Sequence, residues 1–151
     1  MSTALTTPPD PRPDPRPTAE ANLGYLFRLA YQRFRIALDE AVCDLGLSAQ
    51  EYGVLSVFAS RPELSTSELA RIAQVSRQSM HAEVLRLEAA GLVERRARNQ
   101  RAVLVRLTRR GRSRLAAATK RVRAVEAAAL AGLSADEERA VRHWLARMSA
   151  G

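Results

Sequence analysis

Arginine dominates one stretch in the second half of this sequence. Nine arginines and a single acidic residue lie between Glu94 and Arg114. A guanidinium group stays charged and donates paired hydrogen bonds to phosphate or carboxylate oxygens. A solvated charge run usually mixes both signs, and this one does not. With a net charge of +8 for the chain, the stretch predicts a surface for an anionic partner, of which nucleic acid is the commonest.

Two short apolar runs predict the element that carries these arginines. Leu92 and Val93 form one strand, and Val103, Val105 and Leu107 alternate with other residues in a second. We expect the segment between them to be the polar tip of a β-hairpin. Arginines on such a tip contact phosphates and enter the minor groove of DNA. They are Arg95, Arg96, Arg98 and Arg101.

Two short predicted helices precede the hairpin. A capping box of Ser65 and Glu68 starts the first, and Ser76 caps a second that runs to about Ala90. Residues 73–76 form a tight turn between them. Two helices joined in this way, the second polar at its start, are typical of a DNA-binding helix-turn-helix. An ordinary helical hairpin is the alternative.

The segments on both sides predict helices with more apolar surface than one small domain needs. Between residues 18 and 45, apolar residues cover more than one helical face, and Gly46 ends that helix. Capping boxes at Ser48 and Ser134 start two more helices. A further helix, after Thr108, carries an apolar seam over residues 115–129. We favour pairing of two subunits through the first helix and this seam; packing inside one subunit is the alternative.

The composition excludes several other classes of protein. One cysteine and two histidines are too few for a disulfide framework or a metal site. No nucleophile–base set or phosphate loop is present, so we expect neither an enzyme nor a cofactor. Without a membrane-length apolar run or a secretory signal, we expect a cytoplasmic protein with no membrane contact. Residues 1–17 hold six of the seven prolines and predict a disordered tail.

Three segments, in their order and spacing, resemble the MarR family of winged helix-turn-helix regulators. They read ELARIAQVS, RLEAAGLVERR and RAVLVRLTRRG. The resemblance implies a mainly α fold, with a winged helix-turn-helix DNA-binding domain over residues 48–108. The helices of residues 18–47 and 109–151 would form a dimerisation domain. It further implies a homodimer on a pseudo-palindromic operator in double-stranded DNA. Many family members release DNA when a small aromatic or anionic effector binds.

The resemblance also assigns roles to single residues. The residues on the second helix of the motif are implied to contact bases and phosphates, and Arg101 is implied to enter the minor groove. The helix residues are Ser76, Arg77, Gln78, Ser79, His81 and Arg86. Three positions depart from the family pattern. Asn99 replaces a usual aspartate, Ala82 a polar contact residue and Glu83 an apolar residue, so we infer no operator sequence from relatives.

Four other side chains predict where an effector would bind. Tyrosine and arginine suit an aromatic carboxylate through stacking and a bidentate ion pair. These residues are Tyr25, Arg28, Tyr31 and Tyr52, for which half-buried packing is the alternative. Cys43 is expected to be a structural thiol because Asp44 beside it disfavours the thiolate.

Together these patterns favour a sequence-specific transcriptional regulator, a ligand-responsive repressor, that acts as a homodimer. The alternative is a winged-helix scaffold that binds proteins or coats DNA without sequence preference. Footprinting separates the readings, because a regulator protects a palindrome and a coating protein protects DNA uniformly.

Overall fold

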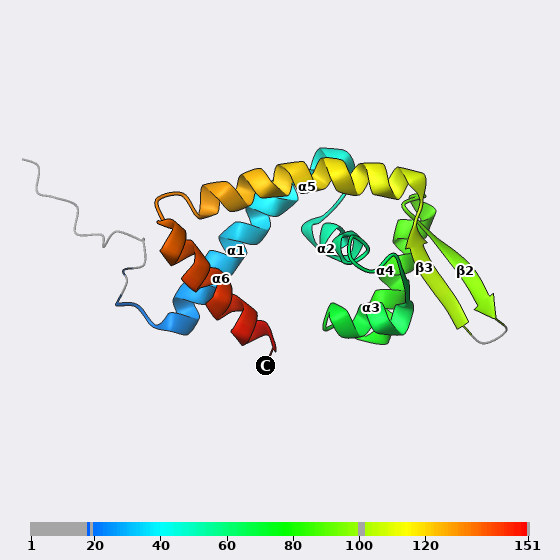
Figure 1. Cartoon of the computed structure of the whole chain (residues 1–151), viewed down its shortest axis with the longest axis horizontal. Coiled ribbons are helices and arrows are strands. Elements are labelled where there is room, and N and C mark those ends of the chain that lie inside the picture. Colours follow the sequence, from blue (N-terminus) through cyan, green and yellow to red (C-terminus); the bar gives the residue numbers. More distant parts are fainter. Residues whose placement is uncertain (1–17, 19, 100–101, 151) are drawn as a thin grey trace, which may run out of the picture.

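The computed structural model describes residue 18, residues 20–99 and residues 102–150. The expected tail of residues 1–17 and the expected minor-groove residue Arg101 lie outside the described residues. The chain is mainly helical: the long helix α5 runs along the molecule, α1 and α6 lie towards one end, and a small sheet lies at the other (Figure 1). Its elements are α1 (Leu23–Val42), the 3-10 helix η1 (Cys43–Leu45), α2 (Ala49–Val57), β1 (Glu63–Ser65), α3 (Thr66–Ile72), α4 (Arg77–Ala89), β2 (Val93–Asn99), β3 (Ala102–Leu107), α5 (Arg109–Ala129) and α6 (Ala135–Ala150).

The three capping boxes expected from the sequence are confirmed. At the start of α2, the Ser48 hydroxyl accepts the Glu51 N–H at 3.1 Å, and the Glu51 carboxylate accepts the Ser48 N–H at 2.8 Å. The same reciprocal pair starts α3 at Ser65 and α6 at Ser134. Each box satisfies backbone donors that have no partner inside the helix, so it fixes where the helix begins.

The sheet is antiparallel with strand order β1-β3-β2. The sequence patterns did not predict β1, which is only three residues long. The expected polar tip is also wrong in extent, because β2 pairs with β3 from Val93 opposite Leu107 as far as Asn99 opposite Ala102. Arg95, Arg96 and Arg98 therefore lie on a strand. The alternating apolar residues that predict a strand stop at Val93, but backbone pairing continues to Asn99. Pairing can continue because an antiparallel ribbon that faces solvent needs no apolar side chains.

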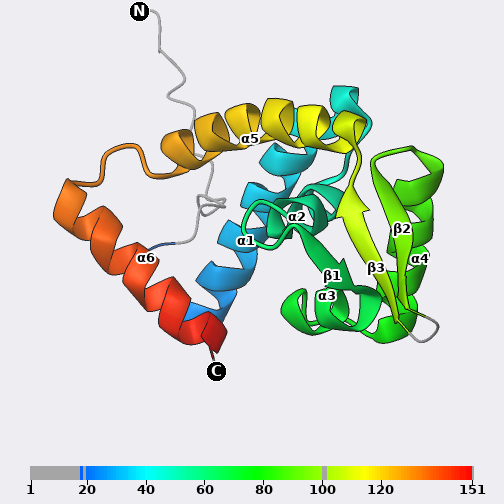
Figure 2. The same cartoon turned by 45° about the vertical axis from the view of Figure 1, so that its right-hand side comes forward.

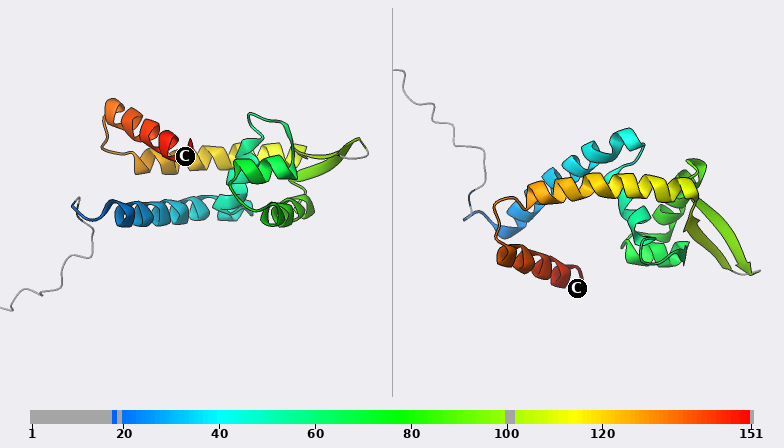
Figure 3. Two further views of the ribbon diagram at one scale, coloured as in Figure 1. Left: turned by 90° about the horizontal axis from the view of Figure 1, so that it is seen from below. Right: turned by 45° about the horizontal axis from the view of Figure 1, so that its top comes forward.

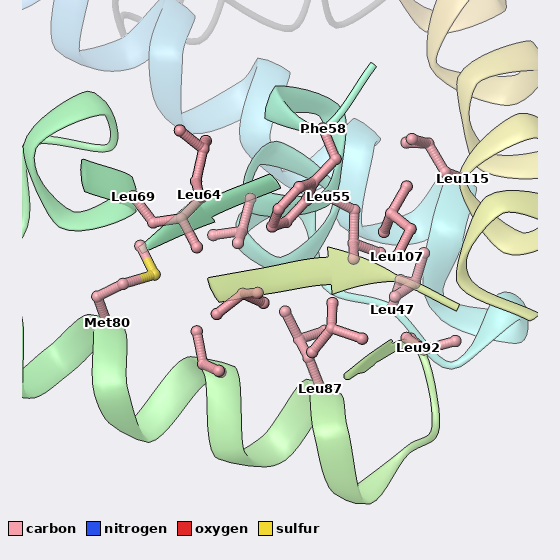
Figure 4. Packing of buried hydrophobic residues seen from close by; sticks show 14 of the residues in the cluster. Leu47, Leu55, Phe58, Leu64, Leu69, Met80, Leu87, Leu92, Leu107 and Leu115 are labelled. Carbon is pink, nitrogen blue, oxygen red and sulfur yellow. The ribbon is translucent and has the colours of Figure 1, made fainter. Parts of the chain in front are cut away.

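The hydrophobic core lies where α2, α3, α4 and the sheet meet, and α1 and α5 close it (Figure 4). We call the part from α2 to β3 the winged lobe. Leu55 from α2, Leu69 from α3, Leu87 from α4 and Val105 from β3 are at most 1% exposed. Close packing of these side chains fixes the angles between the helices of the lobe.

The α5 seam packs mainly inside its own subunit, contrary to the expected pairing between subunits. Leu115, Ala118 and Val122 are 8%, 0% and 3% exposed and belong to the core. They are buried because α5 runs along α1 and also contacts α2 and β3 of the same chain. Arg121 reinforces this contact by donating to the Ala41 carbonyl at 3.2 Å and by pairing with Asp44. The hydrogen bond from the Arg121 guanidinium to the Asp44 carboxylate lowers the pKa of that carboxyl.

The helix α6 contributes no buried residue to the core. Most of it lies at the end of the molecule opposite the sheet (Figure 2). Its Trp144 ring packs edge-to-face with the ring of Phe27 on α1, with ring centroids 6.0 Å apart. Large apolar side chains nevertheless remain exposed on both helices: Leu23, Tyr25, Phe27, Tyr31 and Ile36 on α1, and Val141, Leu145 and Met148 on α6. Single exposed apolar residues are normal on a protein surface, but a group of this size on two neighbouring helices indicates an interaction surface.

Candidate nucleic-acid interface

The turn between α3 and α4 is sharp and held by backbone bonds. The Val75 N–H donates to the Ala70 carbonyl at 3.0 Å. Gln74 adopts a left-handed conformation with φ 54°, which non-glycine residues rarely adopt. The turn sends α4 away from α3, and the contacts between the two helices then fix α4 in the lobe.

One face of α4 anchors it and the start of the opposite face is free to bind. Met80, Val84 and Leu87 are 2%, 1% and 1% exposed. The Ser76 hydroxyl accepts the Ser79 N–H at 3.0 Å, which caps the helix. The residues expected to contact DNA are exposed, namely Ser76, Arg77, Gln78, Ser79, His81 and Arg86. The structure therefore gathers donors of several kinds on one projecting helix end.

The ribbon of β2 and β3 projects beyond the helices at the same end of the molecule (Figure 3). Arg95 and Arg96 lie on β2 and are exposed. Arg95 pairs with Glu88 of α4 at 2.8 Å, which ties the ribbon to that helix. On β3, Arg106 donates to Glu94 at 2.6 Å, across the ribbon. Acidic partners thus hold the base of the ribbon, and the arginine-rich part extends from it.

The burial of Glu83 on α4 was not expected from the sequence. This residue is 1% exposed and lies on the buried face of the helix. Its carboxylate accepts from the Arg86 guanidinium and from Gln50 Nε2 at 3.5 Å. Burial raises the pKa of this carboxyl, the Arg86 charge opposes that rise, and Glu51 adds to it. The signal was present in the spacing, because residues 80, 83, 84 and 87 share one helical face.

The four residues expected to bind an effector do not share one site within the described subunit. The Arg28 guanidinium lies over the Tyr25 ring, 5.4 Å from its centroid. Tyr31 lines a cavity of about 480 Å³ between α1, α5 and α6. Tyr52 of α2 is half-buried and packs against the core of the winged lobe.

The described part of the chain was also searched for metal sites and membrane-spanning helices. Across residues 20–99 and 102–150, no group of three histidine, cysteine, aspartate or glutamate side chains could hold a metal ion. In the same ranges, no helix is long and apolar enough to cross a membrane. The Cys43 thiol is exposed and donates to the Glu40 carbonyl at 3.3 Å.

A helix-turn-helix followed by a β-ribbon defines the winged helix-turn-helix class. The MarR family matches this chain over residues 45–102. The HTH-type transcriptional repressor Rv2887 of Mycobacterium tuberculosis is 36% identical over 131 residues, which are 85% of this chain and 94% of that repressor. The chain therefore belongs to the MarR family.

Solved structures share this architecture and confirm the expected fold class. A probable transcriptional regulator from Pseudomonas aeruginosa matches with a TM-score of 0.77 and 28% identity, covering 85% of this chain and 97% of that one. Rv2887 has been solved in complex with DNA (TM-score 0.70, 36% identity, 85% and 98% covered). It has also been solved in complex with salicylic acid (TM-score 0.68, 36% identity, 86% and 98% covered).

Proposed function

We propose that this protein is a ligand-responsive transcriptional repressor that binds a pseudo-palindromic operator as a homodimer. The observation that carries the proposal is the exposed polar start of α4 beside a projecting, arginine-bearing ribbon. A helix end of this kind fits the major groove, and a basic ribbon fits the adjacent backbone and minor groove. The 36% identity to a repressor that has been solved with DNA supports the same function.

Within this proposal, some contacts to DNA recognise the base sequence and others bind the phosphate backbone. Gln78 and His81 would meet base edges, because amide and imidazole groups form specific hydrogen bonds there. Arg77 and Arg96 would contact phosphates, which fix position without reading sequence. Arg98, near the end of β2, and Arg101, outside the described residues, are proposed to approach the minor groove.

The dimer would form through the helices outside the winged lobe. The cavity of about 480 Å³ between α1, α5 and α6 is lined mainly by apolar side chains, including Phe34 and Leu145. Together with the exposed apolar residues of α1 and α6, it suits the same helices of a second copy. We therefore assign residues 18–47 and 109–151 to dimerisation and residues 48–108 to DNA binding.

The effector is proposed to be a small aromatic acid. Rv2887 has been solved with salicylic acid and with p-aminosalicylic acid. In this chain, Arg28 offers a guanidinium for a carboxylate, and Tyr25 and Tyr31 offer aromatic faces. Dimer formation would have to bring Tyr52 and the α1 residues around one ligand.

Footprinting of the DNA that flanks this protein's own gene tests the proposal. We expect a protected pseudo-palindrome whose two halves lie about one helical turn apart. Adding salicylate should weaken that protection. Uniform protection of every fragment would favour the alternative of a DNA-coating protein, and no protection would favour a protein-binding scaffold.

A further inference from the structure

The last turn of α6 is tied to the helix-turn-helix by one side chain. Gln74, in the turn between α3 and α4, donates from Nε2 to the Ser149 backbone carbonyl at 3.5 Å. Figure 2 shows the end of α6 pointing towards α3. Carbonyls in a last helical turn have no partner inside the helix, so the glutamine amide supplies one. Among the residues that the structure describes, no other hydrogen bond or ion pair joins α6 to the winged lobe.

The backbone of Gln74 would suit glycine better than glutamine. Its φ of 54° lies in the left-handed region, directly after Ala73, the C-cap of α3. Glycine is the usual residue at this position, because a Cβ atom strains the left-handed conformation. Glycine, however, could not reach Ser149. Strained residues concentrate where a side chain has a function, and the structure gives Gln74 the bond to α6.

This bond joins two parts of the chain that have different proposed roles. Ser149 lies on α6, which belongs to the proposed dimerisation helices. Gln74 lies two residues before Ser76, whose hydroxyl caps α4. The hydrophobic core fixes α4 inside the winged lobe, but that core contains no residue of α6. The bond therefore fixes the start of α4 relative to the dimerisation helices.

We propose that Gln74 is a positioning residue: by binding the end of α6, it sets the separation of the two α4 helices in the dimer. It selects operators by the spacing of their half-sites and reads no base. A two-fold dimer matches half-sites about one helical turn apart, so rotation of a lobe misplaces its α4. A lobe that is held in place before binding loses less freedom when it binds DNA. This role rests on the proposed function, whereas the link between α6 and the lobe does not.

Operator binding tests the spacing role, with half-sites at the native separation and at one base pair more or less. Gln74→Gly removes the amide and suits the left-handed backbone, so urea unfolding should show no loss of stability. By anisotropy, it should bind the native operator about tenfold more weakly, as expected for one hydrogen bond in each subunit. It should also discriminate less between the three spacings, and bind an isolated half-site as the wild type does. Unchanged discrimination between spacings would overturn the proposal.

Two changes in α6 test the acceptor. Ser149→Pro breaks the last turn of the helix and displaces the accepting carbonyl, whereas Ser149→Ala keeps the backbone and is the matched control. Ser149→Pro should reproduce the losses of Gln74→Gly, and combining the two should add nothing, because both remove the same contact. Additive losses would overturn this contact as the cause. Equal weakening of Gln74→Gly on operator, half-site and scrambled DNA would mean that Gln74 binds phosphate itself, and would also overturn the proposal.

Electron paramagnetic resonance measures the position of the lobes without DNA. Arg61→Cys, at an exposed position of the winged lobe, together with Cys43→Ser, gives one thiol per subunit for a spin label. Gln74→Gly should broaden the distribution of distances between the two labels of the dimer. An unchanged distribution would overturn the positioning role. A broadened distribution in a protein that binds no operator would contradict the proposed function and leave the link between α6 and the lobe intact.

Discussion

Burial of Glu83 makes the stability of the winged lobe depend on pH. Because burial raises the pKa of this carboxyl in the folded state, its stabilising contribution is complete below the unfolded pKa. That contribution is lost as the pH rises through the folded pKa. Glu83→Gln removes the titrating group, so its unfolding free energy minus that of the wild type should increase as the pH rises above the ordinary glutamate value of about 4.5.

Urea denaturation of both proteins at several pH values measures this difference. The other carboxyl groups are common to the two proteins, so their titrations largely cancel. A difference that stays constant or falls with rising pH would show that Glu83 is charged at no cost in the folded protein.

At the scale of elements, Gly111 in the first turn of α5 packs against the segment that leads into β2. The Thr108 hydroxyl donates to the Gly91 carbonyl at 2.7 Å and accepts the Gly111 N–H at 2.9 Å. A Cβ atom on Gly111 would lie 1.9 Å from the Leu92 carbonyl oxygen, too close for any packed structure. Gly111→Ala should therefore destabilise the protein by about 2–4 kcal/mol, despite the better helix propensity of alanine.

Gly53→Ala is the matched control, because its Cβ atom would meet nothing within 4 Å. That variant should gain about 0.5–1 kcal/mol from helix propensity. Thermal or urea unfolding of both variants gives the comparison. If Gly111→Ala is as stable as Gly53→Ala, the close packing of α5 on the start of β2 is wrong.

The elements that sequence patterns predicted are those fixed by nearby residues. Each capping box joins groups three residues apart, so Ser48, Ser65 and Ser134 marked helix starts directly. The strand β1 and the full length of β2 depend on pairing with β3, which lies far along the chain from β1. The same applies to Val122, whose apolar spacing on α5 is equally compatible with a partner subunit and with α1 of its own chain.

The order of the helices and the ribbon was sufficient to predict the class of interface, because a helix-turn-helix and its wing are contiguous in sequence. The burial of Glu83 was not predicted, because residue type outweighed its position on the apolar face. The pairing of Arg95 with Glu88 was not predicted either, since it depends on how the ribbon folds back against α4.

At the scale of the whole molecule, α6 offers a test of dimerisation that leaves the core intact. Leu145 is 41% exposed and lines the cavity between α1, α5 and α6. Leu145→Glu should keep the fold, because the side chain lies outside the core, and should give a monomer that binds operator weakly. Light scattering and circular dichroism measure mass and fold.

Val122→Glu is the informative comparison, because Val122 is 3% exposed inside the subunit. It should lower the unfolding temperature through an uncompensated buried charge, and not only alter the mass. A dimeric Leu145→Glu protein would remove α6 from the proposed interface.

The positive charge of the molecule predicts how operator affinity responds to salt. If α4 and the ribbons neutralise about six phosphates per dimer, log affinity should fall with log salt at a slope of about −5. Anisotropy at several salt concentrations gives the slope. Arg96→Ala should make the slope shallower by about one for each phosphate that it leaves without a cation, whereas Arg123→Ala, at an exposed position of α5, should not. A slope near zero would mean that the arginines do not face DNA.

The most direct test of the proposed function is a pair of binding curves, on the operator and on a scrambled duplex at one salt concentration, for Gln78→Ala. Gln78 is exposed at the start of α4, and Gln32→Ala, at an exposed position of α1, is the matched control. Gln78→Ala should lose about 1–3 kcal/mol on the operator and little on scrambled DNA, while Gln32→Ala should change neither. Gln78→Ala with an unchanged ratio of the two affinities, and the same result for His81→Ala, would contradict the assignment of α4 as the element that reads DNA.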